Sequence, residues 1–235
     1  LNDNIRGAKW LTEEEKALLE RNISADTKAK QDHGVLGAFR NVKVLILSLV
    51  YFCLAMGIYG VSFWLPTLIK ALGVKDALNV GLLTSIPYAF ATAGMIIGSR
   101  SGDLRRERRW HVAVPAALGG IGLLLSTLGG GMVPSMAALS LATMGILTAV
   151  PLFWSLPTAI LTGTAAAAGI ALVNSIGNLA GFASPYLVGY IKDKTHSTDV
   201  ALYLLSGALF IAAVVVIVAI PARLVNPDAP RADGH

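Results

Sequence analysis

The sequence predicts an all-α membrane protein with six transmembrane helices. Of its 235 residues, 54% are hydrophobic and 14% are charged, with a mean hydropathy of +0.64, whereas soluble domains carry about 25% charged residues. A helix needs roughly 20 apolar residues to cross the hydrocarbon core of a bilayer. Four stretches of at least that length contain no Asp, Glu, Lys or Arg: Val44 to Ile69, Ala77 to Ser99, Trp110 to Ile191 and Val200 to Ala222.

Residues 1–43 are expected to lie outside the membrane, because they are polar and lack the apolar core of a secretory signal. Thr12 and Glu15 have the spacing of a capping box, in which both side chains bond to backbone amides at a helix start. We therefore expect a short amphipathic surface helix up to about Asn22, followed by a polar linker. Because the sequence begins at Leu1 without methionine, we expect a fragment or a processed chain.

The first span is predicted from Val44 to Ile69. Pro66 near its end is expected to kink this helix or unwind its last turn. The second span is predicted from Val80 to Ser99. It has a small residue at every fourth position, a pattern typical of close helix packing in membranes; these are Gly81, Ser85, Ala89 and Ala93.

The long third stretch must contain several spans. The glycine run at 129–131 before Pro134 and the segment at 157–163 are expected to interrupt it, because glycine and proline weaken helices. The resulting boundaries are His111 to Leu128 for span three, Ser135 to Pro157 for span four and Leu161 to Gly189 for span five. Span six follows from Val200 to Ile220, and residues 221–235 are expected to form a polar tail.

Span five combines two asparagines with a high density of small residues. Asn174 and Asn178 are four residues apart and therefore share a helix face. Their amides either join neighbouring helices or face a substrate in a central cavity, and the spacing allows both. The small residues form two lines that favour close backbone approach, Gly163, Ala167, Ala171 and Ser175 on one and Gly177 and Gly181 on the other.

The distribution of Lys and Arg predicts the orientation. With six spans, residues 1–43, the loop at 100–109 and the tail fall on one side and carry fifteen basic residues, and the other side carries four. Cytoplasmic loops are enriched in basic residues, so both termini are expected in the cytoplasm. We therefore attribute the net charge of +5 to basic residues that orient the chain in the membrane and contact membrane lipid. We expect no nucleic-acid partner.

The spans contain no pattern that favours an enzyme. They hold no Asp, Glu, Lys or Arg, and His111 lies at a membrane boundary. A serine nucleophile needs a base within reach, and a zinc site needs three or four His, Cys or carboxylate ligands. We therefore expect no catalytic residue, no metal and no cofactor. Cys53 is the single cysteine, so no internal disulfide can form.

A few other polar and aromatic residues are candidates for function. Tyr51 and Tyr59 lie two turns apart in span one, and Trp154 precedes Pro157; helix packing or anchoring at the membrane interface is the simpler explanation for all three. Asp103, in the short basic loop, is expected to cap a nearby helix, since a helix dipole favours a carboxylate at its amino end.

Four segments together resemble the carboxyl-terminal half of a major facilitator superfamily transporter of the anion:cation symporter branch. This branch includes permeases for tartrate, phthalate, hydroxyphenylacetate and sugar acids. The resemblance extends over nearly the whole chain. Its segments are AKWLTEEEKALL, YGVSFWLPTLIK, GDLRRERRWHVAVP and FWSLPTAILTGTAAAAGIALVNSIGNLAGFASPYLVG.

The resemblance implies that the chain supplies spans seven to twelve of a twelve-span fold, with residues 1–43 in the central cytoplasmic loop. It also implies that Trp154 and Asn174 line the substrate cavity, with Tyr51 close to it; Tyr59 and Asn178 are added because they share helix faces with these residues. The loop between spans two and three resembles a gating loop and carries Asp103, Arg108 and Arg109. It departs from the family pattern at Ser99, where glycine is usual, and at Leu104, where arginine is common.

We therefore expect half of a proton-coupled symporter for small organic anions, such as hydroxy, aromatic or sugar acids. It would work by alternating access in the inner (plasma) membrane. The expected partners are the organic anion, a proton, membrane lipid and an amino-terminal six-helix half. The alternative is a truncated or non-transporting six-helix bundle that needs a partner half.

Overall fold

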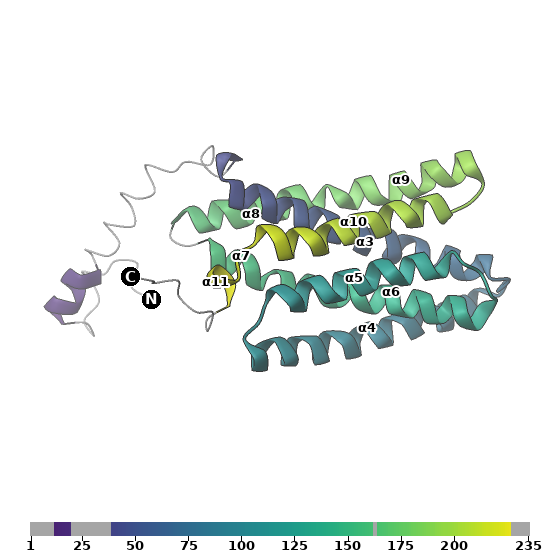
Figure 1. The fold of residues 1–235 in the computed structure, drawn as a ribbon, viewed down its shortest axis with the longest axis horizontal. Coiled ribbons are helices and arrows are strands. Elements are labelled where there is room, and N and C mark those ends of the chain that lie inside the picture. Colours follow the sequence, from purple (N-terminus) through teal and green to yellow (C-terminus); the bar gives the residue numbers. More distant parts are fainter. Residues whose placement is uncertain (1–11, 20–38, 162–163, 227–235) are drawn as a thin grey trace.

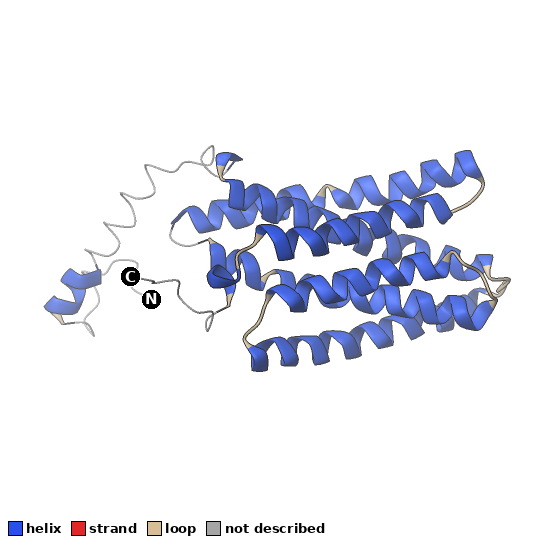
Figure 2. Ribbon diagram, viewed as in Figure 1, coloured by secondary structure: helices blue, strands red, loops and turns tan. Residues whose placement is uncertain are grey.

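The computed structural model describes residues 12–19, 39–161 and 164–226, and all regular structure in these ranges is helical (Figures 1 and 2). The expected end of the surface helix at Asn22, the glycine at 163 and the tail beyond residue 226 lie outside them. The helices of the bundle are α3 (Val42–Ala71), α4 (Ala77–Arg105), α5 (Arg109–Ser126), α6 (Met132–Phe153), α7 (Ser155–Ile160), α8 (Thr164–Asn178), α9 (Ala180–Thr195), α10 (Asp199–Ala219) and α11 (Ala222–Val225).

The capping box predicted at the amino-terminal side is confirmed. The backbone amide and hydroxyl of Thr12 donate to the Glu15 carboxylate at 2.9 and 3.0 Å, and the Glu15 amide donates to the Thr12 hydroxyl at 3.3 Å. A short helix follows at 13–19. Its first turn is therefore fixed by the two side chains that the sequence pattern identifies.

Five helical segments are long and apolar enough to cross a membrane. They are Val42–Ala71, Ala77–Arg105, Met132–Ile160, Ala166–Thr195 and Asp199–Ala219. The helix predicted as span three is present as α5, but it has 18 residues and begins with Arg109, Trp110 and His111. Its apolar part is correspondingly short, and it is not one of the five.

The bundle has a buried centre and two exposed flanks. In the spans formed by α3 and by α6–α7, 61% of an apolar stretch of 18 residues is buried. The corresponding share is 17% in α4 and 22% in α8–α9. Helices α4 and α8–α9 lie on opposite flanks, with α5 and α10 between them (Figure 1). The exposed flanks are therefore the surfaces that remain for lipid or for another helical bundle.

Glycines set the closest helix contact, between α5 and α6. A Cβ atom on Gly122 would overlap the backbone of Ala142, and one on Gly145 would overlap the backbone of Gly119. The two backbones can touch only because these positions lack side chains. Buried serines link other helices, since Ser206 donates to the carbonyl oxygen of Gly120 at 2.8 Å.

The small-residue line predicted for close packing in span two points outward. Gly81, Ser85, Ala89 and Ala93 are exposed, and a Cβ on Gly81 would meet nothing within 4 Å. Within the described bundle this line therefore makes no close contact, and close packing against another bundle stays a prediction. A neighbouring face makes the contact: Cβ atoms on Gly94 and Gly98 would stand 2.6 and 2.7 Å from atoms of Thr148 on α6.

The structure also divides two predicted spans. Span four ends as α6 at Phe153 and continues after Trp154 as the short α7. Span five is interrupted at Leu179, which separates α8 from α9, and it continues to Thr195 rather than Gly189. In contrast, α3 stays helical past Pro66 to Ala71, so its last turn is not unwound.

Candidate functional site

Three aromatic rings meet where α6 gives way to α7. Tyr51 on α3 stacks on Phe153, with ring centroids 5.3 Å apart and planes inclined by 9°. Trp154 packs edge-on against both rings, at 4.8 Å from Tyr51 and 5.4 Å from Phe153. Phe153 is fully buried, whereas Tyr51 and Trp154 are half-buried. Such pairs favour one mutual arrangement, so the buried Phe153 holds two polar aromatic residues at the bundle surface.

Two glycines of span five lie directly against the rings of the tyrosines of α3. A Cβ on Gly177 would overlap the Tyr51 ring, and a Cβ on Gly181 would stand 3.2 Å from the Tyr59 ring. These glycines form one of the two lines predicted from the sequence, and that line makes the expected close contact. Ala167, Ala171 and Ser175, on the other line, are exposed. The packing of α3 against α8 and α9 therefore depends on these two glycines.

A chain of hydrogen bonds connects Tyr59 to both asparagines. The Tyr59 hydroxyl donates to Asn178 Oδ1 at 2.9 Å. Asn178 Nδ2 in turn donates to the backbone carbonyl and to Oδ1 of Asn174, both at 2.9 Å. Both asparagines remain exposed on the surface of the bundle. Asn178 therefore acts partly as the structural link that the sequence allowed, and it fixes the orientation of Asn174.

The helix break lies directly beside this chain. Asn178 is the last residue of α8, and α9 begins at Ala180. Irregular backbone at membrane depth is tolerated where it is buried in protein or lines an aqueous cavity. The five residues predicted for substrate binding thus form one continuous group, linked by the contacts of Trp154 with Tyr51, of Tyr51 with Gly177 on α8, and of Tyr59 with Asn178.

The group offers hydrogen bonds but no charge. Within the described ranges, the Tyr51 hydroxyl, the Trp154 indole N–H and the Asn174 Nδ2 atom donate no hydrogen bond to the protein. The described residues also contain no cluster of three His, Cys, Asp or Glu that could hold a metal. The arrangement can therefore orient a polar ligand by uncharged donors and aromatic surfaces.

The loop between α4 and α5 is organised by Glu107, which the sequence reasoning missed. Its carboxylate accepts from the backbone amides of Arg109 at 3.0 Å and Trp110 at 2.8 Å, and so caps the start of α5. It also accepts from Asn226 Nδ2 at 3.2 Å and lies 3.3 Å from Nδ1 of His111. An acidic residue just before the first apolar turn is a helix-start signal that could have identified it.

The two arginines predicted for the gating loop bind the ends of other helices. Arg108 donates to the Ser155 carbonyl of α7 at 3.0 Å, and its backbone amide donates to Asn226 Oδ1 at 3.1 Å. Arg109 donates to the carbonyl of Ile217 near the end of α10. A cation is favourable at the carboxyl end of a helix, which is where Arg109 lies on α10, whereas Arg108 bonds to the first residue of α7. The two bonds together tie α5, α7 and α10 at one end of the bundle.

Asp103 does not cap a helix. Helix α4 continues beyond the predicted end at Ser99 to Arg105, so Asp103 lies in its last turn, exposed and without a hydrogen bond to any described residue. The expected capping role belongs to Glu107, four residues later. The chain then turns at Arg106, whose φ of 50° ends α4. A part for Asp103 in gating stays a prediction.

Comparison with known proteins gives a family for this fold. The model of the Major Facilitator Superfamily matches residues 7–185. The chain is 40% identical over 220 residues to a putative tartrate transporter of Agrobacterium vitis, a match that covers 93% of this chain and 51% of that protein. It is also 40% identical over 229 residues to the putative metabolite transport protein NicT of Pseudomonas putida, covering 96% and 52% of the two chains.

A third relative is the inner membrane transport protein RhmT of Escherichia coli, 36% identical over 221 residues, with coverage of 92% and 49%. The chain thus spans about half the length of the curated relatives it matches. The resemblance to the tartrate-permease branch that the sequence motifs indicated is confirmed.

Proposed function

The chain belongs to the Major Facilitator Superfamily, and we propose that it forms one half of a secondary transporter for small organic anions. This family consists of transporters, so the expectation that the chain is not an enzyme is confirmed. It is a multi-pass membrane protein. In the proposed carrier, two bundles rock around a binding site near the middle of the membrane.

The observation that carries this proposal is the uncharged group around the helix break. Tyr51, Trp154 and Asn174 present donors that bond to no described residue, and stacking and the Tyr59–Asn178 bond hold them in place. Because their donors are uncharged, they bind the carboxylate or hydroxyl oxygens of an anion weakly enough for the anion to be released. The balancing positive charge would come from the other half.

The exposed flanks support a missing half. Helix α4 and the α8–α9 pair are long and apolar, but less than a quarter of the apolar 18-residue stretch in each is buried. We propose that an amino-terminal six-helix half covers these flanks, that α5 is a sixth span despite its short apolar part, and that residues 1–43 form the central cytoplasmic loop. Both termini would then lie in the cytoplasm, with the carrier in the inner membrane. We infer proton coupling from the resemblance to the symporter branch.

The substrate class follows from the names of the relatives, of which two are putative tartrate transporters. We propose hydroxy acids such as tartrate as the first candidates, with aromatic and sugar acids next. The uncharged hydroxyl and amide donors of the group suit the hydroxyl groups of such molecules as well as their carboxylates.

The test is uptake of labelled tartrate, phthalate and gluconate into proteoliposomes that contain the complete carrier, with and without an inward proton gradient. Asn174→Ala is expected to lower uptake about tenfold or more, the loss that follows when a hydrogen bond to a charged group is removed. Ser175→Ala, a change on the exposed small-residue line beside it, is the matched control and should transport normally. Absence of uptake for every acid would favour the non-transporting bundle instead.

A further inference from the structure

A cavity of about 520 Å³, with both polar and apolar residues in its wall, lies at the end of the bundle remote from the α4–α5 loop. It is formed by the last turn of α3, the end of α9 and the start of α10, and it is separate from the aromatic group around Tyr51. Small-molecule sites typically have volumes of roughly 300–1,000 Å³. The cavity is therefore large enough for a molecule with several carbon atoms and two carboxylates.

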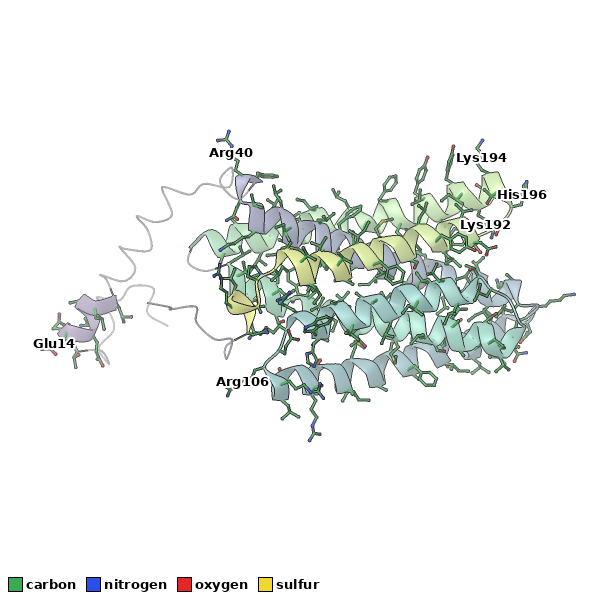
Figure 3. All side chains as sticks on the ribbon, in the orientation of Figure 1. Glu14, Arg40, Arg106, Lys192, Lys194 and His196 are labelled. Carbon is green, nitrogen blue, oxygen red and sulfur yellow. The ribbon has the colours of Figure 1, made fainter. Side chains whose placement is uncertain are left out.

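Its charge is predominantly positive. Lys70 of α3 and Lys192 of α9 line it together with His196, and Asp199 is the one carboxylate on its wall among the described residues. The Lys192 ammonium lies 5.0 Å from the centroid of the Trp64 ring, an arrangement that positions a cation without neutralising it. Neither lysine forms an ion pair with a described carboxylate. Figure 3 shows Lys192 and His196 at this end.

The start of α10 adds hydrogen-bond donors to the same cavity. Its N-cap residue, Thr198, makes no side-chain capping bond, and of the first-turn amides that of Asp199 donates to Ser197 Oγ at 3.1 Å. His196, with a φ of 56°, ends α9 and turns the chain so that Ser197 and Thr198 line the cavity. The amino end of a helix attracts anions, and here it converges with two unpaired ammonium groups and with the hydroxyl-bearing residue Thr67.

We propose that this cavity is an anion-binding site that captures a small carboxylate at the mouth of the carrier, before the carboxylate reaches the group around Tyr51. The choice of an organic carboxylate rests on the proposed function. Lys70 and Lys192 bind its oxygens, and the hydroxyls of Thr67 and Ser197 favour a hydroxy acid. The phosphate of an anionic lipid has the same oxygen chemistry, so the test must separate the two sources.

The site is tested by protection of lysines in the complete carrier, reconstituted in phosphatidylcholine vesicles. A water-soluble amine-reactive ester labels exposed lysines, and mass spectrometry measures the labelling rate of each with and without tartrate. Tartrate is expected to slow labelling of Lys70 and Lys192 but not of Lys194, which lies over the Tyr190 ring and outside the cavity. Equal labelling of all three lysines under all conditions would overturn the proposal.

A second set of vesicles containing phosphatidylglycerol separates the sources. If Lys70 and Lys192 are protected there without tartrate, and tartrate has no effect in phosphatidylcholine, the anion is a lipid phosphate and the capture role is wrong. Protection by tartrate in phosphatidylcholine alone identifies a soluble carboxylate.

Uptake kinetics then test the capture role. Lys192→Gln is expected to raise the KM for tartrate about tenfold, as the loss of a charge-assisted hydrogen bond predicts, with kcat unchanged. Lys194→Gln removes the same charge two residues away and should leave the KM unchanged. An unchanged KM in Lys192→Gln would contradict capture. Protection without any uptake would instead count against the proposed transport function while leaving the anion site intact.

Discussion

The Tyr59 hydroxyl on α3 donates a hydrogen bond of 2.9 Å to the amide oxygen of Asn178, the last residue of α8. Asn178 passes this constraint to Asn174 through two further bonds of 2.9 Å. The residue at which span five breaks is therefore held by a helix far away in the sequence. The orientation of Asn174, an exposed donor of the candidate site, depends on a bond that does not involve its own side-chain nitrogen.

Removing this bond should affect transport more than folding. Tyr59→Phe deletes only the donor, and a hydrogen bond between membrane helices contributes about 0.6 kcal/mol on average. We expect a shift of thermal unfolding of only a few degrees but a clear fall in tartrate uptake, because Asn178 and Asn174 lose their fixed orientation. Tyr203→Phe, at an exposed position on α10, is the control. Normal uptake in Tyr59→Phe would show that the chain of bonds has no part in transport.

Gly177 should tolerate no side chain. A Cβ atom there would overlap the ring of Tyr51, so Gly177→Ala must displace Tyr51 from its stack on Phe153. We expect Gly177→Ala to lower both the unfolding temperature and uptake. Gly81→Ala is the matched control, since a Cβ at Gly81 meets nothing within 4 Å and alanine favours a helix by up to about 1 kcal/mol. Equal behaviour of the two variants would contradict the close contact of α3 with α8.

The carboxylate of Glu107 should stabilise the α4–α5 end of the bundle. Glu107→Ala removes the cap of α5, a loss that typically costs about 0.5–2 kcal/mol, and leaves Asn226 Nδ2 without its acceptor. We expect a lower unfolding temperature in thermal-shift measurements. Asp103→Asn alters a carboxylate in the same segment that bonds to no described residue and should have no effect. A larger effect of Asp103→Asn would restore the capping role predicted for it.

The short helix at 13–19 should weaken in acid. Hydrogen bonds from the Thr12 backbone and hydroxyl lower the pKa of Glu15 below its ordinary value of 4.5. Because the pKa is lowered in the folded helix, the stabilisation is complete above the ordinary value and is lost as the pH falls through the lowered one. We expect the protection of the Glu15 and Lys16 amides against exchange, measured relative to their intrinsic exchange rates at each pH, to fall over this acidic range. Glu14→Gln should leave the transition in place, whereas Glu15→Gln should abolish it.

The helices could be predicted from the sequence because their cause is local. Charge-free stretches of spanning length identified every membrane-sized helix, and the Thr12–Glu15 spacing identified the capping box. The break at Leu179 could not be predicted, because the glycines on either side of it fit a continuous packing line equally well. The bond and the ring contact that Tyr59 makes there come from a different helix, α3. The predicted end of span two at Ser99 was also too early, because α4 continues through its basic end as far as Arg105.

The candidate site was predicted in part. The resemblance and shared helix faces selected five residues that the fold brings into one continuous group. The sequence could not reveal Phe153 as the ring that supports Tyr51 and Trp154, because any apolar residue fits the pattern there. It also favoured Asp103 over Glu107, since the choice depends on where α4 ends. Repeated small residues did not separate the packed line at Gly177 and Gly181 from the exposed lines.

The most direct test of the account is the accessibility of residue 174 in the complete carrier. Asn174→Cys places a thiol at the candidate site. The chain without this substitution is the control, since its own Cys53 is buried. We predict that a charged, water-soluble methanethiosulfonate reagent modifies residue 174 and that tartrate slows this reaction. A thiol that no water-soluble reagent reaches, or one that reacts equally fast with and without every acid tested, would place the amides of span five outside the substrate path.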